Sequence, residues 1–139
     1  METATLLDQV TLIPRVFKAD GRGWFLKVID GDERELPAEI GEVYLTMAIP
    51  GEVRGNHYHQ RTAEWFTVVN GKALLRLLDP STSETRDIQL ESSSPLTVYV
   101  PPGIAHAFQN PEDADEEMLL VAYAGSRYDP ADTIPLKLL

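Results

Sequence analysis

The chain has 139 residues, the length of one domain, and its 43% hydrophobic and 24% charged residues exclude a disordered protein and predict a core of its own. The absence of cysteine excludes disulfides and thiolate chemistry, and a formal net charge of −10 argues against a nucleic-acid surface, which requires clustered lysine and arginine. The first residues lack a basic segment followed by an apolar run, and the most apolar stretch, 118–124, is too short to cross a bilayer, so we expect a cytoplasmic protein without membrane contact.

Short apolar runs bounded by turn residues follow one another along the chain, and no window of helical length shows an apolar period of 3.6 residues. We therefore expect an all-β protein of roughly ten strands in a small double-sheet barrel of the jelly-roll type. One domain is expected over 1–139, with an N-terminal strand or arm over 1–15 and an extended tail over 125–139. The expected strands are 10–18, 24–29, 43–49, 65–69, 72–78, 85–90, 96–100, a run through His106 and Phe108, and 118–124.

Asn70-Gly71 is the clearest turn signal in the sequence. It separates the runs 65–69 and 72–78 by two residues, and Asn-Gly supplies the positive φ angles that a tight two-residue turn requires. The sequence therefore predicts that these two runs pair as a hairpin.

The segment before this turn holds the residues with the clearest chemistry. His57 and His59 are two apart, so on a strand they point to one face, and a short turn can fold Glu64 back toward them. His106 follows a second turn and can complete the set from across a sheet. Three histidines and a carboxylate predict a divalent metal site, with zinc as the first expectation and iron, manganese, nickel or copper as alternatives.

The spacing of these residues and of the flanking turns resembles the two sequence motifs of the cupin superfamily. One position departs from them: Pro95 stands where a glycine is expected, which affects a turn and no ligand. The resemblance implies a double-stranded β-helix, the cupin barrel. The matching residues are Gly51, His57, His59, Glu64 and Gly71 in the first motif and Pro101, Gly103, His106 and Asn110 in the second.

Within the cupins, the runs 20–23, 54–59 and 128–130 resemble enzymes that modify nucleotide sugars. The chain is most similar, from about Val16 to Leu139, to the C-terminal cupin domain of capsular polysaccharide epimerase/reductases, a metal-binding C3-epimerase. It is more distantly similar to dTDP-4-keto-rhamnose 3,5-epimerases and dTDP-sugar 3,4-ketoisomerases. The resemblance implies an epimerase or isomerase of a UDP- or dTDP-linked 4-keto-6-deoxy sugar in cell-surface polysaccharide synthesis. It also implies a homodimer, and a reductase on a separate chain that would act on the product.

Removal of a proton next to a ketone requires a base, a group that stabilises the enolate oxygen, and a proton donor. His57 matches the base position of the rhamnose epimerases, but a histidine that ligates a metal through one nitrogen cannot use that nitrogen as the base. Glu64, Lys72 or a tyrosine such as Tyr123 are then the alternatives, and Tyr58, Tyr99 and Tyr128 are further candidates for the acid. The expected clamps for the nucleotide diphosphate are Arg22, Arg54, Lys72 and Arg76.

Two other functions remain open from the sequence. Three histidines and one glutamate are also the ligands of many cupin oxygenases, which makes an iron-dependent dioxygenase an alternative. A sugar- or metal-binding cupin without catalytic activity is the other.

Overall fold

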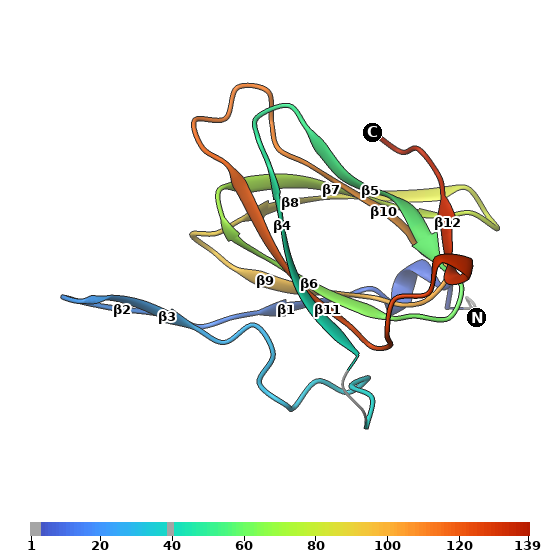
Figure 1. Ribbon diagram of the computed structural model, residues 1–139, viewed down its shortest axis with the longest axis horizontal. Helices are drawn as coiled ribbons and strands as arrows, with labels where there is room; N and C mark the ends of the chain where they lie inside the picture. The colour runs from blue at the N-terminus through green and yellow to red at the C-terminus, as the bar shows by residue number, and fades with distance from the viewer. Residues whose placement is uncertain (1–3, 39–40) are drawn as a thin grey trace.

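The computed structural model describes residues 4–38 and 41–139, which form two five-stranded antiparallel sheets and one two-stranded hairpin. The sheets face each other as the two walls of a barrel (Figure 1). Their strand orders are β1-β9-β6-β11-β4 and β12-β5-β10-β7-β8, and β2 pairs with β3. The strands are β1 (Thr11–Pro14), β2 (Phe17–Asp20), β3 (Gly23–Leu26), β4 (Glu42–Ala48), β5 (Val53–His59), β6 (Glu64–Asn70), β7 (Lys72–Asp79), β8 (Glu84–Glu91), β9 (Leu96–Val100), β10 (Ala105–Gln109), β11 (Met118–Ala124) and β12 (Thr133–Pro135).

Helical structure is limited to two 3₁₀ turns, η1 (Leu7–Gln9) and η2 (Pro130–Asp132), in the part of the chain that is described. The predicted all-β jelly-roll fold is therefore confirmed, with more and shorter strands than the sequence indicated. Within residues 4–38 and 41–139 no helix is both long and apolar enough to cross a membrane.

The core lies between the two sheets and follows from the alternation of side chains along each strand. On β7 the buried residues Ala73, Leu75 and Leu77 alternate with more exposed ones, and on β11 the buried residues are Met118, Leu120, Ala122 and Ala124. Phe66 and Phe108 meet across the barrel with ring centroids 4.9 Å apart. Phe66, Phe108 and Leu120 also line a cavity together with His57 and His106, so the apolar core borders the polar residues described below.

The predicted hairpin at Asn70-Gly71 is wrong. β6 pairs with β9 and β11 in one sheet, whereas β7 pairs with β8 and β10 in the other. Gly71 has a φ of 77°, but Asn70 does not have the positive φ that a type I′ hairpin turn also requires. A Cβ at Gly71 would lie 2.7 Å from the carbonyl oxygen of Glu117, so this glycine is required by a close backbone approach. The two residues form a corner that carries the chain from one wall of the barrel to the other.

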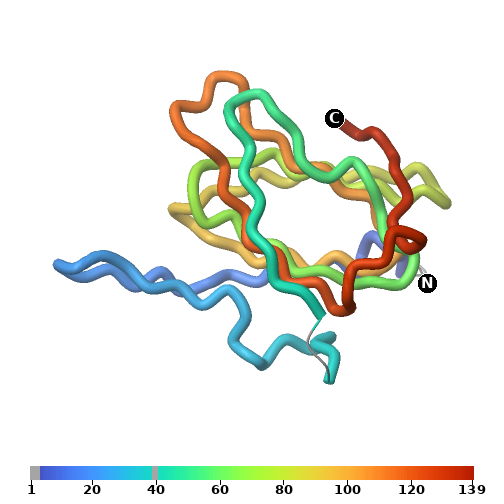
Figure 2. Tube along the Cα trace, in the orientation of Figure 1, coloured from blue at the N-terminus to red at the C-terminus, as the bar shows by residue number. Residues whose placement is uncertain are grey.

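The region 10–29 also differs from its prediction. The expected strand 10–18 is divided into β1, which pairs with β9, and β2, which pairs with β3. The β2–β3 hairpin, called the arm below, projects away from the barrel (Figures 1 and 2). Phe17 and Trp24 stack on it with ring centroids 5.2 Å apart and remain 42% and 57% exposed. The arm therefore carries an apolar surface that this chain leaves uncovered.

Candidate active site

The four residues that the spacing selected lie together at one end of the barrel. His57 and His59 come from β5, Glu64 from the start of β6 and His106 from β10, and one potential ligand atom from each lies within 4.8 Å of the others. His57 and His106 are direct partners across the β5–β10 ladder. Because β6 belongs to the opposite sheet, the cluster joins the two walls of the barrel.

Hydrogen bonds on the far side of two imidazole rings fix their orientation. The Nδ1 atom of His106 lies 3.1 Å from the carbonyl oxygen of Ile104, and Nδ1 of His59 lies 3.2 Å from Oγ1 of Thr133. The Nε2 atoms therefore face Glu64, whose Oε1 is 2.6 Å from His59 and 3.7 Å from His106. Such partners orient histidine ligands in metal sites.

The electrostatics of His106 fit a cation in this cluster. The side chain is only 2% exposed, and burial lowers its pKa to about 4, so the imidazole is neutral at physiological pH. Since the Ile104 carbonyl can only accept a hydrogen bond, the proton sits on Nδ1 and the lone pair on Nε2. Nε2 has no hydrogen-bond partner among the described residues and faces a carboxylate. A lone pair opposite an anion is stabilised by a positive ion between them, which is the arrangement that a divalent metal would satisfy.

Glu64 is held as a carboxylate despite its burial. Burial raises its pKa, but the hydrogen bonds from His59 and Tyr44 outweigh that effect and lower it. In turn, burial lowers the pKa of His59, and the Glu64 carboxylate more than offsets this and raises it. Each partner thus favours the charged form of the other.

Tyr44 belongs to this network, although nothing in the sequence singled it out. Its hydroxyl donates a hydrogen bond of 2.7 Å to Oε2 of Glu64. Burial and the Glu64 charge raise its pKa, so the phenol keeps its proton at neutral pH. Tyr44 alternates on β4 with Val43 and Leu45, and here the apolar residues face outward while the tyrosine faces the cluster. Because strands normally bury their apolar face, the alternation in the sequence predicts an outward tyrosine and carries no signal for this position.

His57 differs from the other two histidines. It makes no hydrogen bond or ion pair with any residue that the structure describes, and it lines both cavities of this end of the barrel. Burial, assisted by the neighbouring His59, lowers the pKa of His57, so its imidazole is neutral with a free lone pair. It is therefore the group of the cluster most available to accept a proton.

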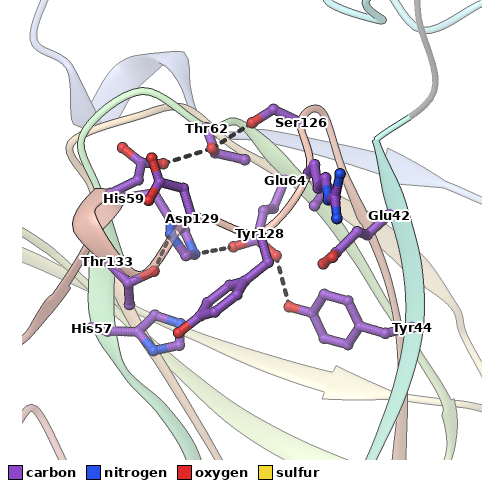
Figure 3. Close-up of a pocket in the computed structure, with 13 residues that line it drawn as sticks. Glu42, Tyr44, His57, His59, Thr62, Glu64, Ser126, Tyr128, Asp129 and Thr133 are labelled. Carbon is purple, nitrogen blue, oxygen red and sulfur yellow. Dashed lines mark hydrogen bonds and ion pairs between the residues drawn. The ribbon is translucent and has the colours of Figure 1, made fainter.

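Two cavities meet at His57 and Tyr44. The first has a volume of about 360 Å³ and is open at the end of the barrel (Figure 3). Glu42, His59 and Tyr128 contribute to its lining, and Tyr128 is 60% exposed at the entrance. The second cavity, of about 300 Å³, continues past the cluster, and its lining includes Arg54, Phe66, His106 and Phe108. A ligand can thus contact the cluster from both cavities at once.

The structure does not bring the other predicted site residues to these cavities. Lys72 and Arg76 point outward because β7 turns Ala73, Leu75 and Leu77 inward. Arg76 pairs with Asp87, and Arg22 lies on the arm, 92% exposed and bound to Asp20. Tyr123 packs edge-to-face against Trp65, with ring centroids 5.5 Å apart, on the face of β11 opposite the inward-facing Ala122 and Ala124. Of the four expected clamps, Arg54 alone lines one of these two cavities, and of the tyrosines named from the sequence, Tyr128 alone does.

A jelly-roll barrel with three histidines and a glutamate gathered at one end defines a cupin. The chain belongs to the polysaccharide biosynthesis C-terminal domain family, whose profile matches residues 18–134.

The curated relatives of this chain include two proteins of polysaccharide and sugar metabolism. The spore coat polysaccharide biosynthesis protein SpsL of Bacillus subtilis is 24% identical over 109 residues, which cover 75% of this chain and 72% of SpsL. A UDP-2-acetamido-2,6-beta-L-arabino-hexul-4-ose reductase of Pseudomonas aeruginosa is 26% identical over 111 residues, covering 80% of this chain but only 28% of the reductase.

The solved structures that share the fold at more than 25% identity include a sugar epimerase and a sugar ketoisomerase. NovW, a 4-keto-6-deoxy sugar epimerase of Streptomyces spheroides, is 27% identical with a TM-score of 0.77, over 91% of this chain and 68% of NovW. The sugar 3,4-ketoisomerase QdtA of Thermoanaerobacterium thermosaccharolyticum, solved in complex with TDP, is 26% identical with a TM-score of 0.73. The match covers 92% of this chain and 88% of QdtA. The sequence resembles both epimerases and ketoisomerases, and each group is thus represented among the structural neighbours.

Proposed function

We propose that this protein is an epimerase or isomerase of a nucleotide-linked 4-keto-6-deoxy sugar, acting in polysaccharide biosynthesis. The observation that carries the proposal is the position of His57, a neutral imidazole without a partner at the junction of two cavities, beside a protonated Tyr44. The family and the activities of NovW and QdtA support it. The cytoplasm stays the predicted compartment.

In this reaction His57 accepts the proton from the carbon next to the ketone. The electron pair of the broken C–H bond moves into the enolate, whose charge resides on the former ketone oxygen. In an epimerase a proton then returns to the same carbon from the other face. In a ketoisomerase the proton of the adjacent hydroxyl moves to the enolate oxygen, and a proton returns to the former ketone carbon, which leaves the new ketone on the carbon that was deprotonated. Tyr44 and Tyr128, both in the lining of the first cavity, are the proposed donors of the returning proton.

We propose that a divalent ion, zinc first and otherwise iron, manganese or nickel, is held by His59, Glu64 and His106. His57 is then free to act as the base, which separates the two roles that the sequence left in conflict. When bound, the ion would supply Lewis-acid stabilisation of negative charge on a substrate oxygen. His59 and His106 already present their Nε2 atoms to Glu64, so this chain needs no rotation of these rings to form the site.

The nucleotide diphosphate is proposed to lie in the second cavity, beside Arg54. In the lining of the first cavity, Arg127 is outnumbered by four acidic residues, Glu42, Glu64, Asp129 and Asp132, which disfavour phosphate groups. Among the residues that the structure describes, the lining of the second cavity has Arg54 as its one cation and includes no acidic residue. An arginine can bind phosphate oxygens through two hydrogen bonds. By analogy with the relative from Pseudomonas aeruginosa, which is a reductase, we propose that a reductase acts on the product.

The test is proton exchange in heavy water. The protein, incubated with UDP- and dTDP-linked 4-keto-6-deoxy sugars, is expected to replace the C3 proton with deuterium, which mass spectrometry and NMR of the recovered sugar detect. The absence of exchange with every such sugar would overturn the proposed function. Oxygen consumption that requires Fe(II) would instead identify a dioxygenase.

We also propose a homodimer, because β4 presents an apolar face to solvent. Val43, Leu45 and Met47 are 64%, 65% and 37% exposed, and β4 lies at the edge of its sheet. On β11 their neighbours are Tyr123, Val121 and Leu119, which extend the same face. Apolar patches of this kind mark protein interfaces, and a sheet edge invites pairing. The exposed aromatic residues of the arm, Phe17, Trp24 and Phe25, offer a second copy a complementary apolar surface.

Leu45→Asp is expected to weaken the dimer by about 30-fold or more, because burying an unpaired charge at the centre of an interface costs at least about 2 kcal/mol. Sedimentation equilibrium measures the dissociation constant. Gln89→Asp, which adds the same charge to an exposed position of β8 on the other sheet, is the control and is expected to leave the dimer unchanged. Wild-type protein that sediments as a monomer at all concentrations would contradict the homodimer.

A further inference from the structure

A β-bulge interrupts β5 immediately before His57. His57 pairs with His106, and Gly55 pairs with Ala107, the next residue of β10, so Asn56 is an extra residue without a partner of its own. Gly55 and Asn56 both have positive φ angles, 100° and 58°. A Cβ at position 55 would lie 2.7 Å from the carbonyl oxygen of His106, so only glycine fits there. Asparagine is among the residues that tolerate a positive φ best.

The bulge changes which side chains share the cavity. In a regular strand successive side chains alternate, so Arg54 and His57, three residues apart, would point to opposite faces. The extra residue restores a common face: Arg54 pairs with the buried Phe108 and lines the same cavity as His57. Bulges are known to redirect side chains in this way next to active sites.

The tail 136–139 fixes Asn56 in this conformation. The Oδ1 atom of Asn56 accepts hydrogen bonds from the amides of Leu138 at 2.8 Å and Leu139 at 3.2 Å, and its Nδ2 donates to the carbonyl of Leu139 at 3.2 Å. The backbone carbonyl of Asn56 accepts from the amide of Leu136 at 2.8 Å. The tail continues from β12, which lies beside β5 in the sheet (Figure 1). Four hydrogen bonds thus tie one strained residue to a segment distant in sequence.

We propose that Asn56 is a positioning residue which, locked to the tail 136–139, keeps Arg54 and His57 on one cavity so that both act on a single substrate. The proposal rests on the proposed function, in which Arg54 binds the diphosphate and His57 removes the proton. Arg54 also donates a hydrogen bond of 2.8 Å from Nε to the carbonyl oxygen of Met47 on β4. Loss of the bulge would displace the Cβ atom of Arg54 and break its hydrogen bond to Met47. The state of this hydrogen bond can therefore be measured independently of catalysis.

Asn56→Ala removes both the tolerance for positive φ and the hydrogen bonds to the tail. Its kcat/KM for proton exchange is expected to fall by about 100-fold, because a displacement of about 1 Å between substrate-binding and reacting groups has effects of that size. A rise in KM should account for much of the loss, since Arg54 binds the substrate in the ground state. Asn56→Asp keeps the acceptor for the two tail amides and tolerates a positive φ, and it is expected to remain close to wild type. Equal kinetics for Asn56→Ala and wild type would overturn the proposal.

The ¹⁵Nε–¹Hε NMR signal of Arg54 provides the second readout. In wild type and Asn56→Asp it should be protected from solvent exchange by the hydrogen bond to Met47, and in Asn56→Ala it should lose this protection while the protein stays folded. A merely structural Asn56 would lower the melting temperature without changing this signal, and that result contradicts the proposal. If no sugar exchanges with wild-type protein, the proposed function fails, but the Arg54 signal still decides whether Asn56 positions this side chain.

The tail offers an independent variant if Asn56→Ala does not fold. Leu138→Pro removes one amide that donates to Asn56 without altering β5, and it is expected to reduce the protection of the Arg54 signal. Lys137→Pro is the matched control, because the Lys137 amide makes no hydrogen bond within the described residues. Equal protection in both proline variants would contradict the role of the tail.

Discussion

His57→Asn is expected to reduce the rate of proton exchange by about 10²- to 10⁴-fold, the usual contribution of a positioned general base. Asparagine approximates the size of the imidazole but has no basic lone pair at neutral pH, and the His57 side chain makes no hydrogen bond or ion pair with residues 4–38 or 41–139 that the substitution would break. Single-turnover exchange in heavy water measures the effect. Tyr58→Phe is the control: it is adjacent on β5 but lines neither of the two cavities, and its rate should match wild type.

The pH dependence of the same reaction tests the assignment separately. The neutral imidazole is the active form, so kcat/KM should fall as the pH drops through the pKa of His57. Burial lowers this pKa below the ordinary histidine value of about 6.5, which puts the acid limb of the profile below that pH. If His57→Asn exchanges the proton as fast as wild type, His57 is not the base and another residue of the cavity has this role.

Glu64→Gln is expected to abolish stoichiometric binding of zinc and the stabilisation that zinc gives. A ligand at 100 times its dissociation constant stabilises a fold by about 2.7 kcal/mol, which for a domain of this size raises Tm by roughly 10 °C. The variant loses the anionic charge that faces the Nε2 atoms of His59 and His106, so added zinc should leave its Tm nearly unchanged. Differential scanning calorimetry and metal analysis measure the two effects.

Asp87→Asn is the matched control for this experiment. It also removes one carboxylate, but on the outer face of the barrel, where Asp87 pairs with Arg76. Zinc should raise the Tm of this variant as much as that of wild type. An equal response to zinc in Glu64→Gln, or wild-type protein that binds no divalent metal, would exclude the proposed site.

The cluster was predictable because its signals are local. Two histidines at a spacing of two must share a face of any strand, and the turns around Glu64 and His106 have the spacing of cupin motifs. The hydrogen-bond network around the cluster was not predictable. Tyr44 faces inward because β4 turns its apolar residues to solvent, which the sequence does not indicate. A prediction from the alternation of apolar and polar residues places the apolar face of a strand in the core of its own chain. The apolar face of β4 instead points to solvent.

The remaining differences arise from register, which a single sequence determines weakly. Arg54 reaches the cavity only through the bulge at Asn56, and counting positions along an ideal strand puts it on the wrong face. Lys72 and Arg76 were candidates because they are cations near the motif, but the inward alternation of β7 excludes both. The Asn70-Gly71 signal was read correctly as a turn and wrongly as a hairpin, because tertiary pairing overrides the local preference.

The corner at Asn70-Gly71 has a consequence for how the protein folds. It separates two strands that are adjacent in sequence but never pair, so most ladders join distant segments, as when Thr11 meets Tyr99. Such high contact order slows folding, because the entropy of closing long loops is lost before the contacts form. Glu64 and the histidines lie on opposite walls and meet only when the barrel closes. Chains in which the barrel is open therefore lack the site, and its assembly reports barrel closure.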